Sequence, residues 1–217
     1  VTLAKDEREM SDDTRDAPRI YLVSPPAFDP ESFGATLARV LDAHDIACLR
    51  LAHASTDADE VARAADALRL IAHERDVPLV IERHIGLVEK LGLDGVHLTD
   101  AARSVRKTRK DLGADAIIGA HCGVSSHEGM SAGENGADYI AFGPVGDSPL
   151  GDGTRAEHDL FAWWSQMIEL PVVAEGALTA DLVATFAPVT DFFAIGAEIW
   201  GQDDPAAALT ALTAPLR

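Results

Sequence analysis

The residues of this chain that could do chemistry follow short apolar runs. Each run is apolar nearly throughout, which is typical of parallel strands covered on both faces. Because the carboxyl ends of parallel strands meet at one edge, where ligands bind, the residues at the run ends are the candidates for a site. They are Ser24, Pro25, Cys48, Arg50, Glu82, His84, His97, Asp100, His121, Cys122, Gly143, Pro144, Glu175, Gly176, Gly196 and Glu198.

Arg50 places a charge inside the apolar run Ile-Ala-Cys-Leu-Arg-Leu at 46–51. An isolated buried charge is costly, so Arg50 must either pair with a carboxylate or face a ligand anion. Glu82, at the end of the next run, is the obvious carboxylate. The sequence leaves both alternatives open, an Arg50–Glu82 ion pair or a clamp for a ligand.

Gly176 and Gly196 follow the last two runs. Barrels of eight parallel strands commonly bind phosphate after the seventh and eighth strands, through backbone N–H groups and the N-terminus of a short helix. Glycine permits the close approach and the unusual φ that such binding needs. We therefore predict a phosphate-binding end at Gly176, Gly196 and Ala197. The alternative is that the glycines only turn the chain.

Several side chains near the predicted site are acceptable donors for zinc or a similar metal. They are His84, His97, His121, Glu82, Asp100, Cys48 and Cys122. The alternative is that His97 is a hydrogen-bonded core histidine while the others line the cleft, and the lack of any diagnostic spacing favours it. A nucleophile–base pair of His121 and Cys122 is rejected, because adjacent residues of a strand point to opposite faces.

Eight apolar runs are the strands that must position these residues. They are Ile20–Ser24, Ile46–Leu51, Pro78–Ile81, Gly95–Leu98, Ala116–Gly119, Tyr139–Phe142, Pro171–Ala174 and Phe192–Ile195. Amphipathic segments between them carry apolar stripes at helical spacing. The stripes are Phe33, Leu37, Val40 and Leu41; Val61, Ala65, Leu68 and Ala72; Leu160, Trp163, Trp164 and Met167; and Ala206, Leu209 and Leu212. Asp57 and Thr179 lie where helix N-caps are expected.

This alternation predicts an α/β fold, a single (β/α)₈ TIM barrel over residues 19–217. A doubly wound sheet is the rival fold, but Ser-Pro-Pro-Ala-Phe-Asp-Pro follows the first strand instead of a Gly-x-Gly-x-x-Gly turn. Residues 1–18 are charged and nearly free of large apolar side chains, which predicts a flexible leader. The Gly-, Pro- and Asp-rich segment 143–157 is the candidate lid over the site.

Net charge, hydropathy and cysteine content limit the partners and the compartment that we expect for this protein. With 36 acidic and 18 basic residues, the formal charge of −18 repels nucleic acid and anionic membrane surfaces, so neither is an expected partner. No apolar run reaches the roughly 18 residues of a membrane span, and the N-terminus lacks a signal peptide's apolar stretch. Cys48 and Cys122 could form one disulfide, but two buried reduced thiols are favoured. We expect a cytoplasmic protein.

Five segments fall in one order at one spacing: GLDGVHLTD (92–100), IIGAHCGVSSHE (117–128), GADYIAFGPV (136–145), PVVAEGAL (171–178) and TDFFAIGAEIW (190–200). Together they resemble the thiamine phosphate synthase family, which also contains the thiazole tautomerases. The resemblance runs from about residue 20 to 215. It implies a (β/α)₈ barrel that uses Mg²⁺ to help expel pyrophosphate from an aminopyrimidine diphosphate, while a thiazole phosphate nitrogen captures the resulting cation.

The family's motifs for the pyrophosphate and Mg²⁺ are altered in this chain. Gln-Leu-Arg-x-Lys on the second strand is Cys-Leu-Arg-Leu-Ala at 48–52, which keeps Arg50 alone of the three polar residues. Asn-Asp after the third strand is Glu82-Arg83. Gln-x-Asp after the fourth strand becomes Asp-Ala-Ala at 100–102, so Asp100 is the one candidate metal ligand.

The other end of the site is largely kept. Ser-x-His after the fifth strand becomes His-Cys-Gly at 121–123, and Gly-Gly after the seventh becomes Glu175-Gly176. Thr154 and Arg155 could replace the Thr and Lys of the loop after Gly143. A tautomerase's histidine would follow Gly143, where this chain has Pro144.

We therefore predict a divergent thiamine phosphate synthase-like transferase that acts on small phosphorylated substrates, with Mg²⁺ implied by the family. The catalytic candidates are Arg50, Glu82, His97, Asp100 and His121, and the phosphate-binding candidates are Gly143, Thr154, Gly176, Gly196 and Ala197. The alternatives are a different enzyme on a small phosphorylated substrate and a non-catalytic barrel that binds a phosphate ester. The apolar helix carrying Trp163 and Trp164 is a candidate homodimer face, although core packing explains it equally well.

Overall fold

Eight parallel strands close into a barrel in sequence order, from β1 to β8 and back to β1, in a computed structural model that describes residues 17–147 and 153–217. The strands are β1 Arg19–Val23, β2 Ile46–Leu51, β3 Leu79–Ile81, β4 Gly95–Leu98, β5 Ile117–His121, β6 Tyr139–Phe142, β7 Val172–Glu175 and β8 Phe192–Ile195. The predicted (β/α)₈ barrel and all eight predicted strands are confirmed, with ends shifted by at most two residues. The predicted leader lies outside the described residues except for Ala17 and Pro18, as does 148–152 of the predicted lid.

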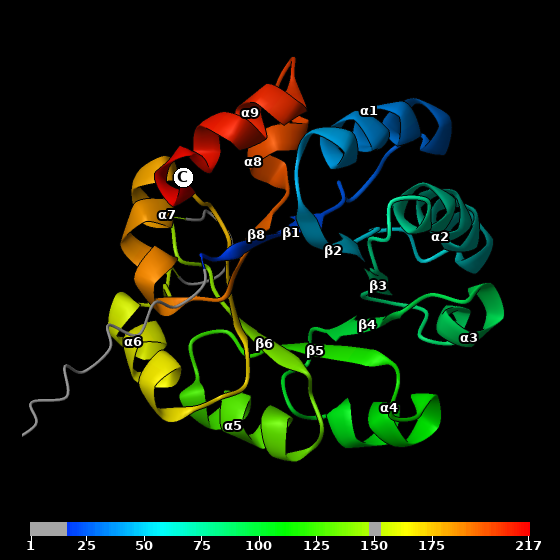
Figure 1. Ribbon diagram of the computed structural model, residues 1–217. Coiled ribbons are helices and arrows are strands. Elements are labelled where there is room, and N and C mark those ends of the chain that lie inside the picture. Colours follow the sequence, from blue (N-terminus) through cyan, green and yellow to red (C-terminus); the bar gives the residue numbers. More distant parts are fainter. Residues whose placement is uncertain (1–16, 148–152) are drawn as a thin grey trace, which may run out of the picture.

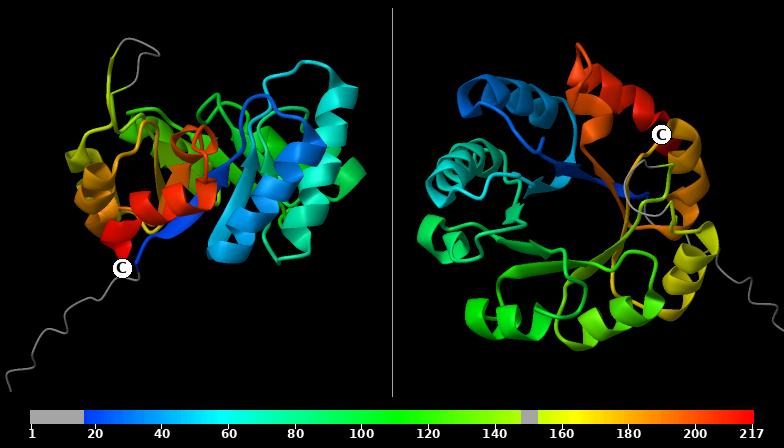
Figure 2. Two further views of the ribbon diagram at one scale, coloured as in Figure 1. Left: turned by 90° about the horizontal axis from the view of Figure 1, so that it is seen from above. Right: turned by 180° about the vertical axis from the view of Figure 1, so that it is seen from behind.

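Helices surround the strands as a ring when the barrel is viewed end-on (Figure 1), and the same ring is seen from behind in Figure 2. They are α1 Pro30–Ala43, α2 Ala58–His73, α3 Leu87–Leu91, α4 Val105–Leu112, α5 Ser126–Glu134, α6 His158–Met167, α7 Ala180–Phe186, α8 Ala197–Trp200 and α9 Pro205–Leu212, with short 3₁₀ turns η1 Ala187–Val189 and η2 Ala214–Leu216. None of the helices in the described segments is long and apolar enough to cross a membrane.

Two predicted helix starts are confirmed. Asp57 accepts hydrogen bonds from the backbone N–H groups of Asp59 and Glu60, and Thr179 accepts one from Leu182. A side-chain acceptor at this position satisfies N–H groups that have no partner within the helix.

The predicted stripes of α1 and α2 are buried throughout, whereas the stripe predicted for α6 is only partly right, since Trp164 is buried and Leu160 packs against the core while its other two residues are exposed. Phe161 and Trp164 are buried in α6, while Trp163 is 40% exposed and Met167 65% exposed. The helix begins at His158, and its apolar residues fit two overlapping stripes, of which the structure buries the one through Phe161.

The interior of the barrel holds a small core of its own, separate from the larger core between strands and helices. Along β2, Leu49 belongs to the outer core and Cys48 to the inner one, so Arg50 projects inward by the same alternation. Gly119 on β5 leaves room for Tyr139, because a Cβ there would lie 2.0 Å from Cζ of the Tyr139 ring. The barrel thus accepts large polar side chains beneath its mouth.

Candidate active site

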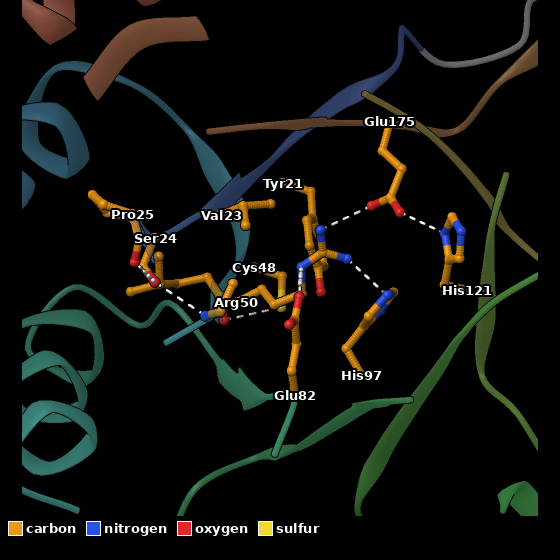
Figure 3. Close-up of polar contacts among 12 residues, drawn as sticks. Tyr21, Val23, Ser24, Pro25, Cys48, Arg50, Glu82, His97, His121 and Glu175 are labelled. Carbon is orange, nitrogen blue, oxygen red and sulfur yellow. Dashed lines mark hydrogen bonds and ion pairs between the residues drawn. The ribbon is translucent and has the colours of Figure 1, made fainter. Parts of the chain in front are cut away.

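Arg50 is the centre of the site. It is 7% exposed and is the only lysine or arginine among the buried residues that the structure describes. Its Nη2 donates to Oε2 of Glu175 at 2.9 Å, its Nη1 lies 2.7 Å from Nε2 of His97, and its Nε forms an ion pair with Oε1 of Glu82 at 3.2 Å (Figure 3). In the absence of a ligand, Arg50 is therefore the centre of an ion-pair network, and Glu82 is one of two carboxylate partners.

We call Arg50, Glu82, Glu175, His97 and His121 the Arg50 cluster. Burial alone would lower the pKa of Arg50, but Glu175 and the other neighbours more than offset it, so that the pKa is raised above its ordinary value. Burial alone would raise the pKa of Glu175, but Arg50 and the contact with His121 hold it well below its usual range. Burial raises the pKa of Glu82 despite the nearby Arg50. Glu175 is thus the firmly ionised carboxylate of the pair.

His97 lies beneath Arg50 and is 1% exposed. A guanidinium has only donors, so Nε2 of His97 accepts from Arg50, and Nδ1 carries the proton that it donates to the Tyr139 hydroxyl at 2.9 Å. The Tyr139 hydroxyl shares a 2.6 Å hydrogen bond with the Tyr21 hydroxyl. Burial, and secondarily Arg50, lowers the pKa of His97 well below its ordinary value. His97 is therefore a neutral, hydrogen-bonded core histidine in this structure.

His121 is the last residue of β5 and lies nearer the open side, with 30% of its side chain exposed. Its Nδ1 is 2.6 Å from Oε1 of Glu175 (Figure 3). Its neighbour Cys122 is buried in the outer core, as the rejection of a His121–Cys122 pair requires. Burial raises the pKa values of Cys122 and Cys48 to about 12, and both are free thiols. A protonated, buried thiol is neither a nucleophile nor a metal ligand.

Glu175 is the residue to which the sequence analysis gave no role. It stands among the strand-end residues, but the carboxylate predicted for Arg50 was Glu82 on the adjacent strand. Glu175 ends β7, whereas Arg50 is on β2, whose hydrogen-bonded neighbours are β1 and β3. A charged residue closing the apolar run Pro-Val-Val-Ala-Glu was the available signal.

The predicted phosphate-binding end lies after β7 and β8. Gly176 and Ala177 have φ values of +91° and +54°, which bend the chain directly after β7. Oε2 of Glu198 accepts from the Gly196 N–H at 2.9 Å, and Oε1 accepts from the Leu178 N–H at 3.1 Å. We call this arrangement the Glu198 bridge, since one carboxylate joins the loops after β7 and β8. An anion-binding position predicted from sequence is thus occupied by this chain's own carboxylate.

The other phosphate-binding candidates differ in what they offer. The N–H of Gly143 donates to the Gly123 carbonyl, so it is already used, and a Cβ at Gly143 would lie 2.4 Å from the Glu175 carbonyl oxygen. Thr154 and Ala197 are exposed. The role of Gly143 in this structure is close packing against β7.

Asp100 does not join the Arg50 cluster. Its Oδ2 accepts from the Ser104 hydroxyl at 2.6 Å, while its buried Oδ1 has no hydrogen-bond partner among the described residues. Within residues 17–147 and 153–217, no three His, Cys, Asp or Glu side chains are grouped so as to hold a metal ion. His84 is half-buried with a φ of +57°.

Residues 20–198 match the model of a protein family described as thiamine monophosphate synthase. A thiamine-phosphate synthase from Rhodospirillum centenum is 39% identical over 196 residues, covering 88% of this chain and 94% of the relative. One from Hyphomonas neptunium is 36% identical and covers 94% and 97%. Among solved structures, a thiamine phosphate pyrophosphorylase from Pyrococcus furiosus superposes with a TM-score of 0.77 at 22% identity, covering 91% of this chain and 95% of the other, which supports the fold.

Proposed function

This chain belongs to the thiamine monophosphate synthase family, and we propose that the mouth of its barrel joins an aminopyrimidine diphosphate to a thiazole phosphate, which gives thiamine phosphate and pyrophosphate. The chain is a transferase of thiamine phosphate synthesis. The observation that carries this function is the match along residues 20–198, which spans every strand of the barrel and both ends of its mouth.

The reaction breaks one bond and forms one. The C–O bond between the pyrimidine methylene carbon and the diphosphate breaks, and the diphosphate leaves with the electron pair. The thiazole nitrogen then donates its lone pair to that carbon, so the positive charge ends on the thiazolium ring. A site for this chemistry needs negative charge near the methylene carbon, a cation for the leaving group and donors for the thiazole phosphate.

The described residues offer groups of each kind. Arg50 can bind a diphosphate oxygen bidentately once its carboxylates yield. Glu82 and Glu175 supply negative charge that favours the developing pyrimidine cation. The backbone N–H groups after β7 and β8 are the donors proposed for the thiazole phosphate: those of Gly176 and Ala197, and that of Gly196 once Glu198 releases it.

The family relationship also implies Mg²⁺, but the described residues do not fit a protein-bound Mg²⁺ ion. Magnesium prefers carboxylate oxygens that are free to approach it. Both carboxylates of the cluster are held by Arg50, and Asp100 is held on one side by Ser104. Arg83 and Ala102 stand at the two positions where the resemblance expects metal carboxylates. We therefore assign no step to a metal ion.

Turnover by the purified full chain tests the function. We expect thiamine phosphate and pyrophosphate to form in a 1:1 ratio from the two substrates, measured by chromatography with and without millimolar Mg²⁺. Arg50→Lys keeps the charge but loses the planar fork, so kcat/KM should fall about tenfold or more. Arg39→Lys on the exposed surface of α1 is the matched control. Binding of thiazole phosphate without any product would contradict the synthase and favour a phosphate-ester-binding barrel.

Two further predictions concern the state of the protein. We infer a cytoplasmic location, which the relation to thiamine-phosphate synthases supports. We also infer a homodimer through α6, which the exposed Trp163 and Met167 support. Sedimentation velocity of wild type and Met167→Lys tests the dimer, and a monomer at micromolar concentrations would contradict it.

A further inference from the structure

Glu175 contacts two basic side chains at once. One oxygen pairs with Nη2 of Arg50 at 2.9 Å, and the other lies 2.6 Å from Nδ1 of His121 (Figure 3). We propose that Glu175 is a specificity-determining residue that competes with the substrate's diphosphate for Arg50 and is retained by His121 when the diphosphate displaces it. This inference rests on the proposed function for the identity of the anion.

Each of the three nitrogens of the Arg50 guanidinium already has one partner. Its three nitrogens face Glu82, His97 and Glu175. His97 cannot yield, because it is buried and bonded from below to Tyr139. A diphosphate that binds the N–H groups facing Glu82 or Glu175 must therefore displace a carboxylate.

The exposures show which partners face the mouth. The side chain of Arg50 is 9% exposed, those of Glu175 and Glu82 are 14% and 20% exposed, and that of His121 is 30% exposed. Exposure thus increases from Arg50 through its two carboxylate partners to His121. The second partner of Glu175 is thus the most exposed of these four side chains.

A displaced carboxylate must keep a partner, since an unpaired buried charge costs several kcal/mol. Among the described residues, Nδ1 of His121 contacts Glu175 and not Glu82. Glu175 can therefore release Arg50 while remaining paired. Glu82 contacts the guanidinium only through Nε.

The backbone around Glu175 is built to seat this side chain. A Cβ on Gly143 would lie 3.0 Å from Cγ of Glu175 and 2.4 Å from its carbonyl oxygen. Gly176, with its φ of +91°, turns the chain immediately after it. Gly143, which the sequence predicted to bind phosphate, leaves room in this structure for the side chain of Glu175.

Pyrophosphate binding to the full chain, measured by calorimetry at fixed ionic strength, tests the proposal. Glu175→Gln keeps the shape but removes the charge, so the Kd for pyrophosphate should fall about tenfold. Glu82→Gln should lower it less. Glu89→Gln, an exposed carboxylate on α3, gives the same change in net charge and should stay within twofold of wild type.

A purely structural role for Glu175 would weaken pyrophosphate binding when the residue is replaced, so a gain in affinity is specific to competition. Glu175→Asp, with one methylene less, should also gain affinity and serves if the glutamine variant folds poorly. In an Arg50→Gln background, Glu175→Gln should bring no gain. Equal or weaker pyrophosphate binding by both Glu175 variants would overturn the proposal.

Turnover separates this inference from the proposed function. If the synthase reaction proceeds, Glu175→Gln should lower KM for the diphosphate substrate and leave KM for thiazole phosphate unchanged. If pyrophosphate binding tightens as expected but no variant makes thiamine phosphate, the competition stands and the synthase function falls. If thiamine phosphate forms while the Glu175 variants gain no affinity, only the competition is refuted.

Discussion

The two ends of the barrel mouth hold negative charge by different means. The Arg50 cluster uses side chains from β2, β4, β5 and β7 and from Glu82 directly after β3, whereas the Glu198 bridge uses backbone N–H groups after β7 and β8. In both, a carboxylate of this chain lies on the group that would bind an anion. Side-chain donors can be removed by single substitutions, but backbone N–H groups remain whatever the side chain. The resemblance to the family is likewise weaker at the first end than at the second.

The largest expected difference between the two ends is in folding stability. Arg50→Gln leaves Glu175 buried without its main cationic partner, so we expect the free energy of unfolding to fall by about 3–5 kcal/mol. Glu198→Ala removes the acceptor of two backbone N–H groups and should cost less, about 1–2 kcal/mol. Urea denaturation of both variants measures the contrast. Equal losses would show that the two ends do not differ in this way.

The next largest expected effect is a dependence of folding stability on pH. It arises from the Arg50 cluster and not from the Glu198 bridge, so it separates the two ends. The folded protein holds His97 neutral with its pKa well below the ordinary value, whereas the unfolded chain protonates it below about pH 6.5. The unfolded state thus binds more protons, and stability falls as the pH drops below about 6.5, by at most about 1.4 kcal/mol per pH unit.

Glu175 acts in the same direction in a lower window. Its folded pKa is depressed, so its contribution is present above its unfolded value near 4.3 and is lost as the pH falls below it. Urea midpoints between pH 5 and 8, above the Glu175 window, isolate the contribution of His97 when wild type is compared with His97→Gln. The variant should lack the slope below pH 6.5, and an unchanged slope would contradict a neutral buried His97.

The smallest expected effect concerns phosphate at the Glu198 bridge. Glu198→Ala frees the N–H groups of Gly196 and Leu178, so the Kd for inorganic phosphate should fall about threefold to tenfold. Asp204→Ala is the matched control, since Asp204 also accepts from two N–H groups, at the start of α9. Calorimetry with inorganic phosphate provides the measurement. A gain in Asp204→Ala equal to that in Glu198→Ala would point to net charge alone.

Periodicity predicted the barrel and its strands because burial on both faces leaves a continuous apolar run. It also placed Arg50, Glu82, His97 and His121 near one end, since strand ends share an edge. It could not pair Arg50 with Glu175, because that contact crosses the barrel interior instead of joining hydrogen-bonded neighbours.

Contacts within loops were equally hidden from the sequence. Glu198 lies only two residues after Gly196, yet its carboxylate folds back onto that residue's N–H through a local turn that no periodicity describes. The buried face of α6 was misassigned because adjacent apolar residues fit more than one stripe. These gaps share one cause, since side-chain direction is settled by packing after the backbone pattern is set.

A chain of hydrogen bonds runs from Arg50 through His97 and Tyr139 to Tyr21, and it has an evolutionary consequence. Each residue determines whether the next must act as a hydrogen-bond donor or acceptor. The four residues come from four different strands. A mutation at one of them is harmful unless the others already suit it, so the four positions are epistatic. Moving Arg50 and its hydrogen-bond partners into a related barrel would therefore require substituting all four positions together.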